Sequence, residues 1–146
     1  MFEPSLSCRV RLTARAFALR LRLSALLRRR SLIDLLCALT PPRAPRAVAP
    51  LPLVEQALSD VEALCERLRV VPDTCLYRGL ARYAVLRDAG YPARFVMGLR
   101  PPARAEIEGH AWVELHGAPA FEAADPSLVV TFAYPDRAHA HARALP

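Results

Sequence analysis

The chain has 146 residues, and its apolar content of 53% excludes a largely disordered protein. This length fits one domain with a single core. All 20 basic residues are arginine and the formal net charge is +6, with the excess between residues 9 and 30. Such a segment suits an acidic peptide or protein partner as well as nucleic acid. No uncharged run approaches the roughly 20 residues of a membrane-spanning helix, which leaves surface association through an amphipathic helix as the membrane alternative.

Residues 1–52 are predicted to form a helical extension followed by a linker. From about Ser5 to Leu39, apolar residues recur at intervals of three and four with arginines on the other face, which is typical of an amphipathic helix. Three arginines followed by Ser31 predict a break and a new helix N-cap. The prolines between residues 40 and 52 predict an extended linker. A third helix is expected from Leu53 to about Leu68, at the start of a core domain that spans residues 53–146.

Cys75 occupies the first turn of the next predicted helix. Asp73 and Thr74 are good N-cap residues, and Gly90 predicts the C-terminal stop. The unpaired N–H groups and the dipole of a helix N-terminus favour an anion, so a nucleophilic thiolate forms more readily there. The alternative interpretation is a cysteine that packs in the core as a small apolar residue.

The other cysteines, Cys8, Cys37 and Cys65, form no C-x-x-C pair, and no cleavable apolar signal precedes them. A disulfide framework is therefore not expected, and the sequence predicts a protein of the reducing cytoplasm. Cys37 and Cys65 lie on apolar helix faces, which favours a structural place in the core for both.

After the Cys75 helix the pattern changes to that of short strands. Strands are expected at residues 93–100, 110–115, 119–122 and 128–132, with a turn at His116 and Gly117. Trp112 and Val113 are expected to pack in the core. Helices followed by consecutive strands with short turns predict an α+β domain with an antiparallel sheet.

A cysteine nucleophile needs a base within hydrogen-bond reach, and the base needs an orienting partner. His110 opens the second predicted strand, where Gly109 would let the backbone come close to the start of the helix. Glu122 lies across the hairpin turn, where its carboxylate could accept a hydrogen bond from the imidazole and fix the tautomer. Cys75, His110 and Glu122 are therefore the candidate catalytic residues.

Three segments carry a family resemblance, namely CLYRGLA at 75–81, GYPARFVMG at 90–98 and HAWVE at 110–114. From residue 74 to about 134 the chain resembles the transglutaminase-like leader peptidases of lasso-peptide biosynthesis. The resemblance implies a transglutaminase-like or papain-like core, with the cysteine-bearing helix packed on a small antiparallel sheet. In that family the cysteine attacks a peptide bond of a ribosomal precursor, the histidine is the base, and an acid completes the triad.

The resemblance also implies a substrate and partners. The substrate would be a lasso precursor, whose leader is removed before an ATP-using cyclase closes the macrolactam. The residues before Asp73 lack the strands of a leader-binding winged-helix domain, so a separate recognition protein is the expected partner, together with the cyclase. Cys75 and His110 match the family pattern, and the acid is assigned to Glu122 with Asp125 as the alternative. No cofactor, metal or nucleic acid is implied.

Two other functions are compatible with the same residues. The first is acyl transfer to an amine in place of water, on the same fold. The second is a binding module without catalysis, in which the basic helix contacts nucleic acid or a membrane. Arg78 and Arg82 either form a solvated helix face or pair with an acid of the catalytic region. His139 and His141 form too small a set of ligands to predict zinc.

Overall fold

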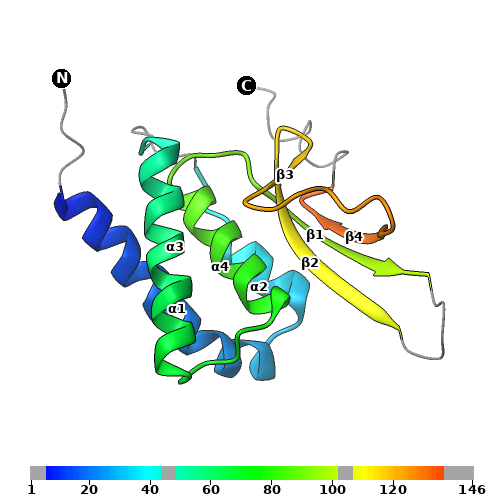
Figure 1. Cartoon of the computed structure of the whole chain (residues 1–146), viewed down its shortest axis with the longest axis horizontal. Helices are drawn as coiled ribbons and strands as arrows, with labels where there is room; N and C mark the ends of the chain where they lie inside the picture. The colour runs from blue at the N-terminus through cyan, green and yellow to red at the C-terminus, as the bar shows by residue number, and fades with distance from the viewer. Residues whose placement is uncertain (1–5, 44–48, 102–106, 137–146) are drawn as a thin grey trace.

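The computed structural model describes residues 6–43, 49–101 and 107–136, which form four helices and a four-stranded sheet (Figure 1). In chain order the elements are α1 (Leu6–Arg29), α2 (Leu32–Leu39), α3 (Leu51–Leu68), α4 (Cys75–Asp88), β1 (Arg94–Arg100), β2 (Glu108–Leu115), β3 (Ala118–Ala120) and β4 (Val129–Tyr134). All paired strands run antiparallel. The predicted α+β class with an antiparallel sheet is therefore confirmed.

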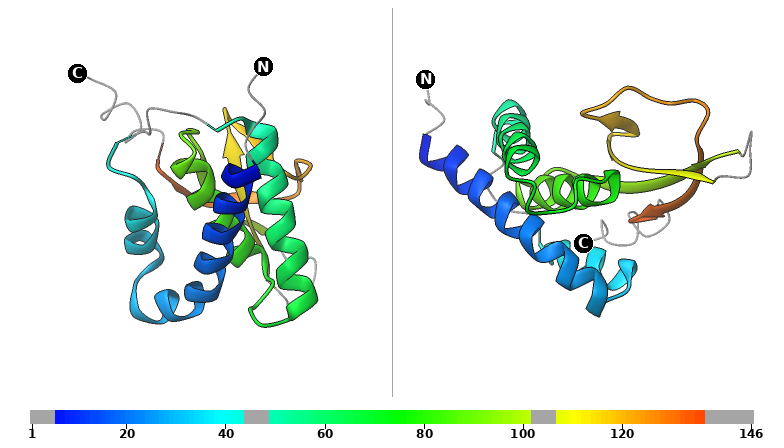
Figure 2. Two further views of the ribbon diagram at one scale, coloured as in Figure 1. Left: turned by 90° about the vertical axis from the view of Figure 1, so that its left-hand side faces the viewer. Right: turned by 60° about the horizontal axis from the view of Figure 1, so that its bottom comes forward.

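Helix α4 is the central element of the fold. It contacts β1 and β2 on one side and α1, α2 and α3 on the others. The strand order is β3-β2-β1-β4, so α4 packs on the two inner strands. In Figures 1 and 2 the helices gather on one side of the molecule and the sheet on the other. The first residue of α4 consequently lies where the helical layer meets the sheet.

The ends of the first three helices follow from local chemistry. The predicted break is confirmed: α1 ends at Arg29, and α2 begins after Ser31, whose Oγ accepts a hydrogen bond from the Asp34 N–H at 3.2 Å. Helix α3 begins two residues earlier than predicted, with Pro52 in its first turn. Proline fits there because the first N–H groups of a helix need no partner within the helix.

The β2–β3 connection is a two-residue hairpin turn. His116 has φ 53° and Gly117 has φ 85°, which are the left-handed conformations that such turns require. The prediction of this turn is confirmed. The predicted strand 119–122 is wrong at its end, because Phe121 has φ 68° and leaves the extended conformation. Glu122 therefore lies in the loop that follows β3.

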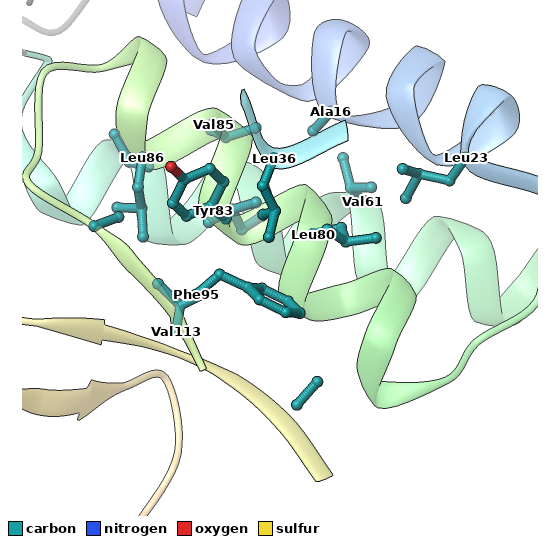
Figure 3. Packing of buried hydrophobic residues seen from close by; sticks show 14 of the residues in the cluster. Ala16, Leu23, Leu36, Val61, Leu80, Tyr83, Val85, Leu86, Phe95 and Val113 are labelled. Atoms are coloured by element: carbon teal, nitrogen blue, oxygen red, sulfur yellow. The ribbon is translucent and has the colours of Figure 1, made fainter. Parts of the chain in front are cut away.

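One buried cluster joins the helices and the sheet (Figure 3). Helix α1 contributes Ala16 and Leu23, α2 contributes Leu36, and the sheet contributes Phe95 and Val113, all at most 1% exposed. The helices before residue 52 thus pack in the same core as the rest of the chain. A division into an extension (1–52) and a core domain (53–146) stays a prediction.

Candidate active site

Cys75 is the first residue of α4, as predicted. Thr74 is the N-cap, and its Oγ1 accepts a hydrogen bond from the Tyr77 N–H at 3.5 Å. The backbone N–H groups of Cys75 and Leu76 belong to this first turn, where no helix carbonyl can accept them. Cys75 is only partly buried. The thiol therefore combines access from outside with two N–H donors beside it.

The other end of α4 is closed by a Schellman motif. Gly90 adopts φ 93°, and the Tyr91 N–H donates to the carbonyl oxygen of Leu86 at 2.9 Å. The predicted C-terminal stop at Gly90 is confirmed. Both ends of the helix are thus fixed by local hydrogen bonds, which fixes the register in which Cys75 occupies the first position.

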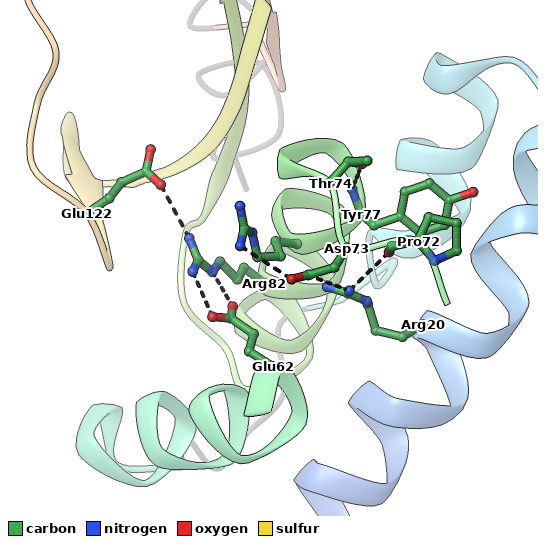
Figure 4. A network of polar contacts seen from close by, with 9 residues as sticks. Arg20, Glu62, Pro72, Asp73, Thr74, Tyr77, Arg82 and Glu122 are labelled. Carbon is green, nitrogen blue, oxygen red and sulfur yellow. Dashed lines mark hydrogen bonds and ion pairs between the residues drawn. The ribbon is translucent and has the colours of Figure 1, made fainter. Parts of the chain in front are cut away.

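Arg20 of α1 holds the loop that leads into Cys75 (Figure 4). Its Nη2 donates to the Pro72 carbonyl oxygen at 3.2 Å and to Asp73 Oδ1 at 3.0 Å. The Arg20 side chain is fully buried. Because Thr74 and Cys75 follow directly, this buried guanidinium fixes the backbone from which the nucleophile starts.

The burial of Arg20 corrects the prediction that the arginines of this helix form one exposed face. Arg20 lies four residues after Ala16 and three before Leu23, and both neighbours are fully buried. That spacing places Arg20 on the apolar stripe of α1. A charged residue on an apolar stripe is the sequence signal that could have identified it as a buried ionic contact.

His110 and Glu122 form the closest contact between two predicted catalytic residues. His110 Nε2 lies 2.8 Å from Glu122 Oε1, which leaves Nδ1 of the imidazole for a second partner. The His110 ring stacks on Trp112, with centroids 6.0 Å apart and planes inclined by 15°. Val113 packs in the core as predicted, whereas Trp112 is buried outside the core cluster, beside His110. Two side chains therefore fix the position of the imidazole.

Asp125, the alternative acid, has other partners. Its carboxylate accepts hydrogen bonds from the Ser127 N–H at 2.9 Å and the Ser127 Oγ at 2.6 Å, and it pairs with Arg100 at 2.8 Å. The hydrogen bonds from Ser127 and the Arg100 guanidinium lower the pKa of Asp125 to about 2. Glu122 is thus the acid that contacts His110, whereas Asp125 is bonded to Ser127 and Arg100.

Gly79 brings the start of α4 close to the strand that carries His110. A Cβ at Gly79 would lie 3.0 Å from Phe95 Cε2 and 3.7 Å from the backbone of Ala111, the residue after His110. Cys75 lies one turn before Gly79. Gly109 has more room, because a Cβ there would meet only Leu99 Cδ2 at 3.4 Å and a carbonyl oxygen at 3.8 Å. The glycine that permits the close approach is therefore Gly79, and the prediction for Gly109 is wrong.

We expect Gly79→Ala to destabilise the protein by about 1–2 kcal/mol. Overpacking against the fully buried Phe95 outweighs the gain of about 1 kcal/mol that alanine has over glycine in a helix. Urea denaturation measures the change. Gly109→Ala is the matched control, because the exposed Leu99 side chain can move aside. Equal stability of Gly79→Ala and wild type would contradict this packing.

Cys75 and His110 belong to neighbouring elements but do not bond in this structure. In the described part of the chain, the Cys75 thiol has no hydrogen-bonding partner. The residues that the structure joins directly are His110 and Glu122.

A cavity of about 580 Å³ lies beside the His110–Glu122 pair. Trp112, Pro119 and Leu128 form apolar parts of its wall, and the ion pair of Glu108 and Arg100 also lines it. Cys75 does not line it. The cavity has room for side chains of a peptide, on the face of β2 that carries His110.

A family model described as transglutaminase-like superfamily matches residues 17–133. The chain belongs to the transglutaminase-like superfamily. The matched segment begins within α1, ends in β4 and includes Cys75, His110 and Glu122. No curated protein and no solved structure matches the chain. Membership in the transglutaminase-like superfamily supports chemistry of the cysteine-protease or acyltransferase type in general.

The remaining cysteines of this transglutaminase-like chain have different surroundings. Cys65 is buried, and burial raises the pKa of its thiol. Cys37 is exposed, with its Sγ 3.1 Å from the Tyr134 hydroxyl, so the predicted core position is wrong for Cys37 and confirmed for Cys65. Cys8 is partly buried. All four cysteines are free thiols. Cys65 is therefore the least reactive, whereas Cys8 and Cys37 have to be replaced before the reactivity of Cys75 can be measured alone.

Two further features concern membranes and metals. Within residues 6–43, 49–101 and 107–136, no helix is long and apolar enough to cross a membrane. Over the same ranges, no three His, Cys, Asp or Glu side chains are grouped to hold a metal ion. His139 and His141 lie outside the described residues.

Proposed function

We propose that this protein is a cysteine endopeptidase that removes the leader from a ribosomally made lasso precursor. Cys75 is the nucleophile, His110 the general base and then acid, and Glu122 the residue that orients His110. The observation that carries the proposal is the 2.8 Å contact between His110 and Glu122. His110 lies on β2, which packs against the helix beginning at Cys75. Superfamily membership supports this type of chemistry.

The reaction follows from the roles of these atoms. His110 donates its Nε2–H to Glu122, so Nδ1 is free to accept the proton of the Cys75 thiol. The thiolate attacks the scissile carbonyl carbon, and the N–H groups of Cys75 and Leu76 stabilise the oxyanion. The imidazolium then protonates the leaving amine, which gives a thioester and the released core peptide. Water, deprotonated by His110, hydrolyses the thioester and restores the thiol.

Partners and location are part of the same proposal. A recognition protein that binds the leader is the first expected partner. A macrolactam cyclase would use the freed amine, so it is the second expected partner. Both steps belong in the cytoplasm, where the precursor is made.

The proposal is tested by mass spectrometry of a lasso-type precursor incubated with the protein, its recognition partner and methylamine. We expect one cut and a leader that carries a carboxyl terminus, because water accepts the acyl group. A leader that carries the methylamide would instead indicate an acyltransferase. An intact precursor, together with unlabelled Cys75 after treatment with iodoacetamide at neutral pH, would favour the binding module.

Glu122→Ala is expected to lower kcat of this cleavage by about 10²- to 10⁴-fold. The effect is smaller than that of removing the nucleophile, because an orienting group assists the reaction without forming a bond. Asp125→Ala is the control and should retain kcat, since Asp125 bonds to Ser127 and Arg100. A loss with Asp125→Ala and none with Glu122→Ala would move the acid to Asp125.

A further inference from the structure

Arg82 contacts Glu122, the proposed catalytic acid (Figure 4). It lies on α4, two turns after Cys75. Its Nη1 is 3.5 Å from Glu122 Oε2. Its Nε and Nη2 bind the two carboxylate oxygens of Glu62, on α3, at 2.7 and 3.1 Å. The side chain is only 11% exposed. A chain of contacts therefore runs from Glu62 through Arg82 and Glu122 to His110.

The two oxygens of Glu122 have separate partners. Oε2 faces Arg82, and Oε1 faces His110 Nε2. A free glutamate side chain samples many rotamers, and restricting it costs conformational entropy. The guanidinium of Arg82 is itself fixed by its two bonds to Glu62, so it provides a rigid support for the carboxylate. This arrangement keeps Oε1 directed at the imidazole.

The backbone before Glu122 is held by the same residue. Phe121 has φ 68°, a conformation that is uncommon for a bulky residue and persists only where its surroundings enforce it. The Arg82 guanidinium carbon lies 5.3 Å from the centre of the Phe121 ring, within the range of a cation–π contact. Arg82 thus contacts both the side chain of Glu122 and the residue that turns the chain towards His110.

Glu62 determines how Arg82 meets Glu122. It binds Nε and Nη2 of the guanidinium at 2.7 and 3.1 Å, and Nη1 is the nitrogen that reaches Glu122 Oε2. Glu122 Oε1 is then left for His110 Nε2.

We propose that Arg82, anchored by Glu62, is a positioning residue that acts on His110 through Glu122. The inference rests on the proposed function, because it assigns Arg82 a part in the same Cys75–His110–Glu122 reaction. Its effect is on proton transfer rather than on substrate binding. It should therefore change kcat and the reactivity of the Cys75 thiol, and leave KM nearly unchanged.

A double-mutant cycle tests this role. In protein that carries Cys8→Ser and Cys37→Ser, the rate of alkylation of Cys75 by iodoacetamide is measured for Arg82→Met, Glu122→Ala and the double variant. We expect Arg82→Met to slow alkylation and to lower kcat by about tenfold, which is a typical coupling between residues in contact. In the Glu122→Ala background the same change should have almost no effect, because the residue it acts through is absent. Arg82→Lys keeps the positive charge but not the paired N–H donors of the guanidinium, and it should recover part of the alkylation rate.

Arg15→Met is the matched control. It breaks an ion pair between α1 and α4, Arg15 to Asp88 at 2.9 Å, that does not reach the site. The proposal would be overturned if Arg82→Met slowed alkylation equally with Glu122 and with Glu122→Ala. It would also be overturned if the loss of rate only paralleled a fall in melting temperature. Either result would show that Arg82 only joins α3 to α4. If Arg82→Met does not fold, Glu62→Gln and Arg82→Lys take its place, and their alkylation rates are again compared with Glu122 and with Glu122→Ala.

The alkylation assay needs no precursor. A precursor that wild type leaves intact, combined with alkylation that depends on Arg82 only when Glu122 is present, would reject the leader peptidase and keep the positioning role. Cleavage that is unaffected by Arg82→Met, with alkylation also unaffected, would keep the peptidase and reject the positioning role. The two proposals are thus separable.

Discussion

Cys75→Ala is expected to reduce precursor cleavage by on the order of 10⁴-fold or more, below detection in most assays, because no other group can form the thioester. The fold should persist. Alanine is a good helix former at the first position of α4, and Thr74 keeps its cap. The Cys75 thiol makes no hydrogen bond in the described structure, so its removal leaves no unsatisfied partner. Mass spectrometry of the products and a thermal melt measure the two effects.

Cys37→Ala is the control for this experiment. Cys37 is an exposed thiol on α2 beside the Tyr134 hydroxyl, and its removal should leave cleavage unchanged. Residual cleavage by Cys75→Ala at more than a few per cent of the wild-type rate would refute Cys75 as the nucleophile. Equal loss in both variants would indicate a general requirement for thiols rather than a specific one.

Asp73→Ala is expected to lower the free energy of unfolding by about 3 kcal/mol, because it leaves the buried Arg20 guanidinium without its counter-charge. For a chain of this size the melting temperature should fall by roughly 10 °C. Arg20→Met should be close to neutral for stability. Two nitrogens of Arg20, Nε and Nη1, are buried without a partner in the described structure, so methionine removes an unfavourable burial along with the ion pair.

Arg20→Met should lower activity although it leaves stability nearly unchanged. This variant keeps its stability but no longer holds the Pro72 carbonyl and the Asp73 carboxylate, so the start of α4 is less well fixed. We expect slower alkylation of Cys75 and a lower kcat with an unchanged melting temperature. Arg9→Met is the control, because the pair of Arg9 with Asp60 lies on the surface of α1 and α3. A large loss of stability in Arg20→Met would contradict the assignment of a net unfavourable burial.

The helix and turn boundaries were predictable because they depend on interactions a few residues long. Ser31 and Thr74 are the N-caps that the structure shows, and Gly90 closes α4 in a left-handed conformation. His116 and Gly117 form the predicted hairpin turn. The end of β3 was not predictable in this way. Phe121 adopts a positive φ beside the Arg82 guanidinium, and that contact joins residues far apart in the chain.

The partners of the charged residues depended on the tertiary structure. Glu122 and Asp125 are both acids soon after the hairpin, and the sequence left the choice between them open. In the fold, Asp125 bonds to Ser127 and Arg100, while Glu122 reaches His110 and Arg82. For Arg82, the sequence allowed either a solvated face or a pair with an acid, and the pair is what forms.

The sequence by itself determined the order of the elements, the α+β class and the place of Cys75 at the start of a helix, since local propensities and caps act over one or two turns. Only the tertiary structure decided that Arg20 is buried against the loop before Cys75 and that Glu62 and Arg82 are linked to His110 through Glu122. The physical reason is that burial and ion pairing depend on which elements pack together. Contacts between α1 and α4, and between α4 and β2, are set by the whole core rather than by neighbouring residues.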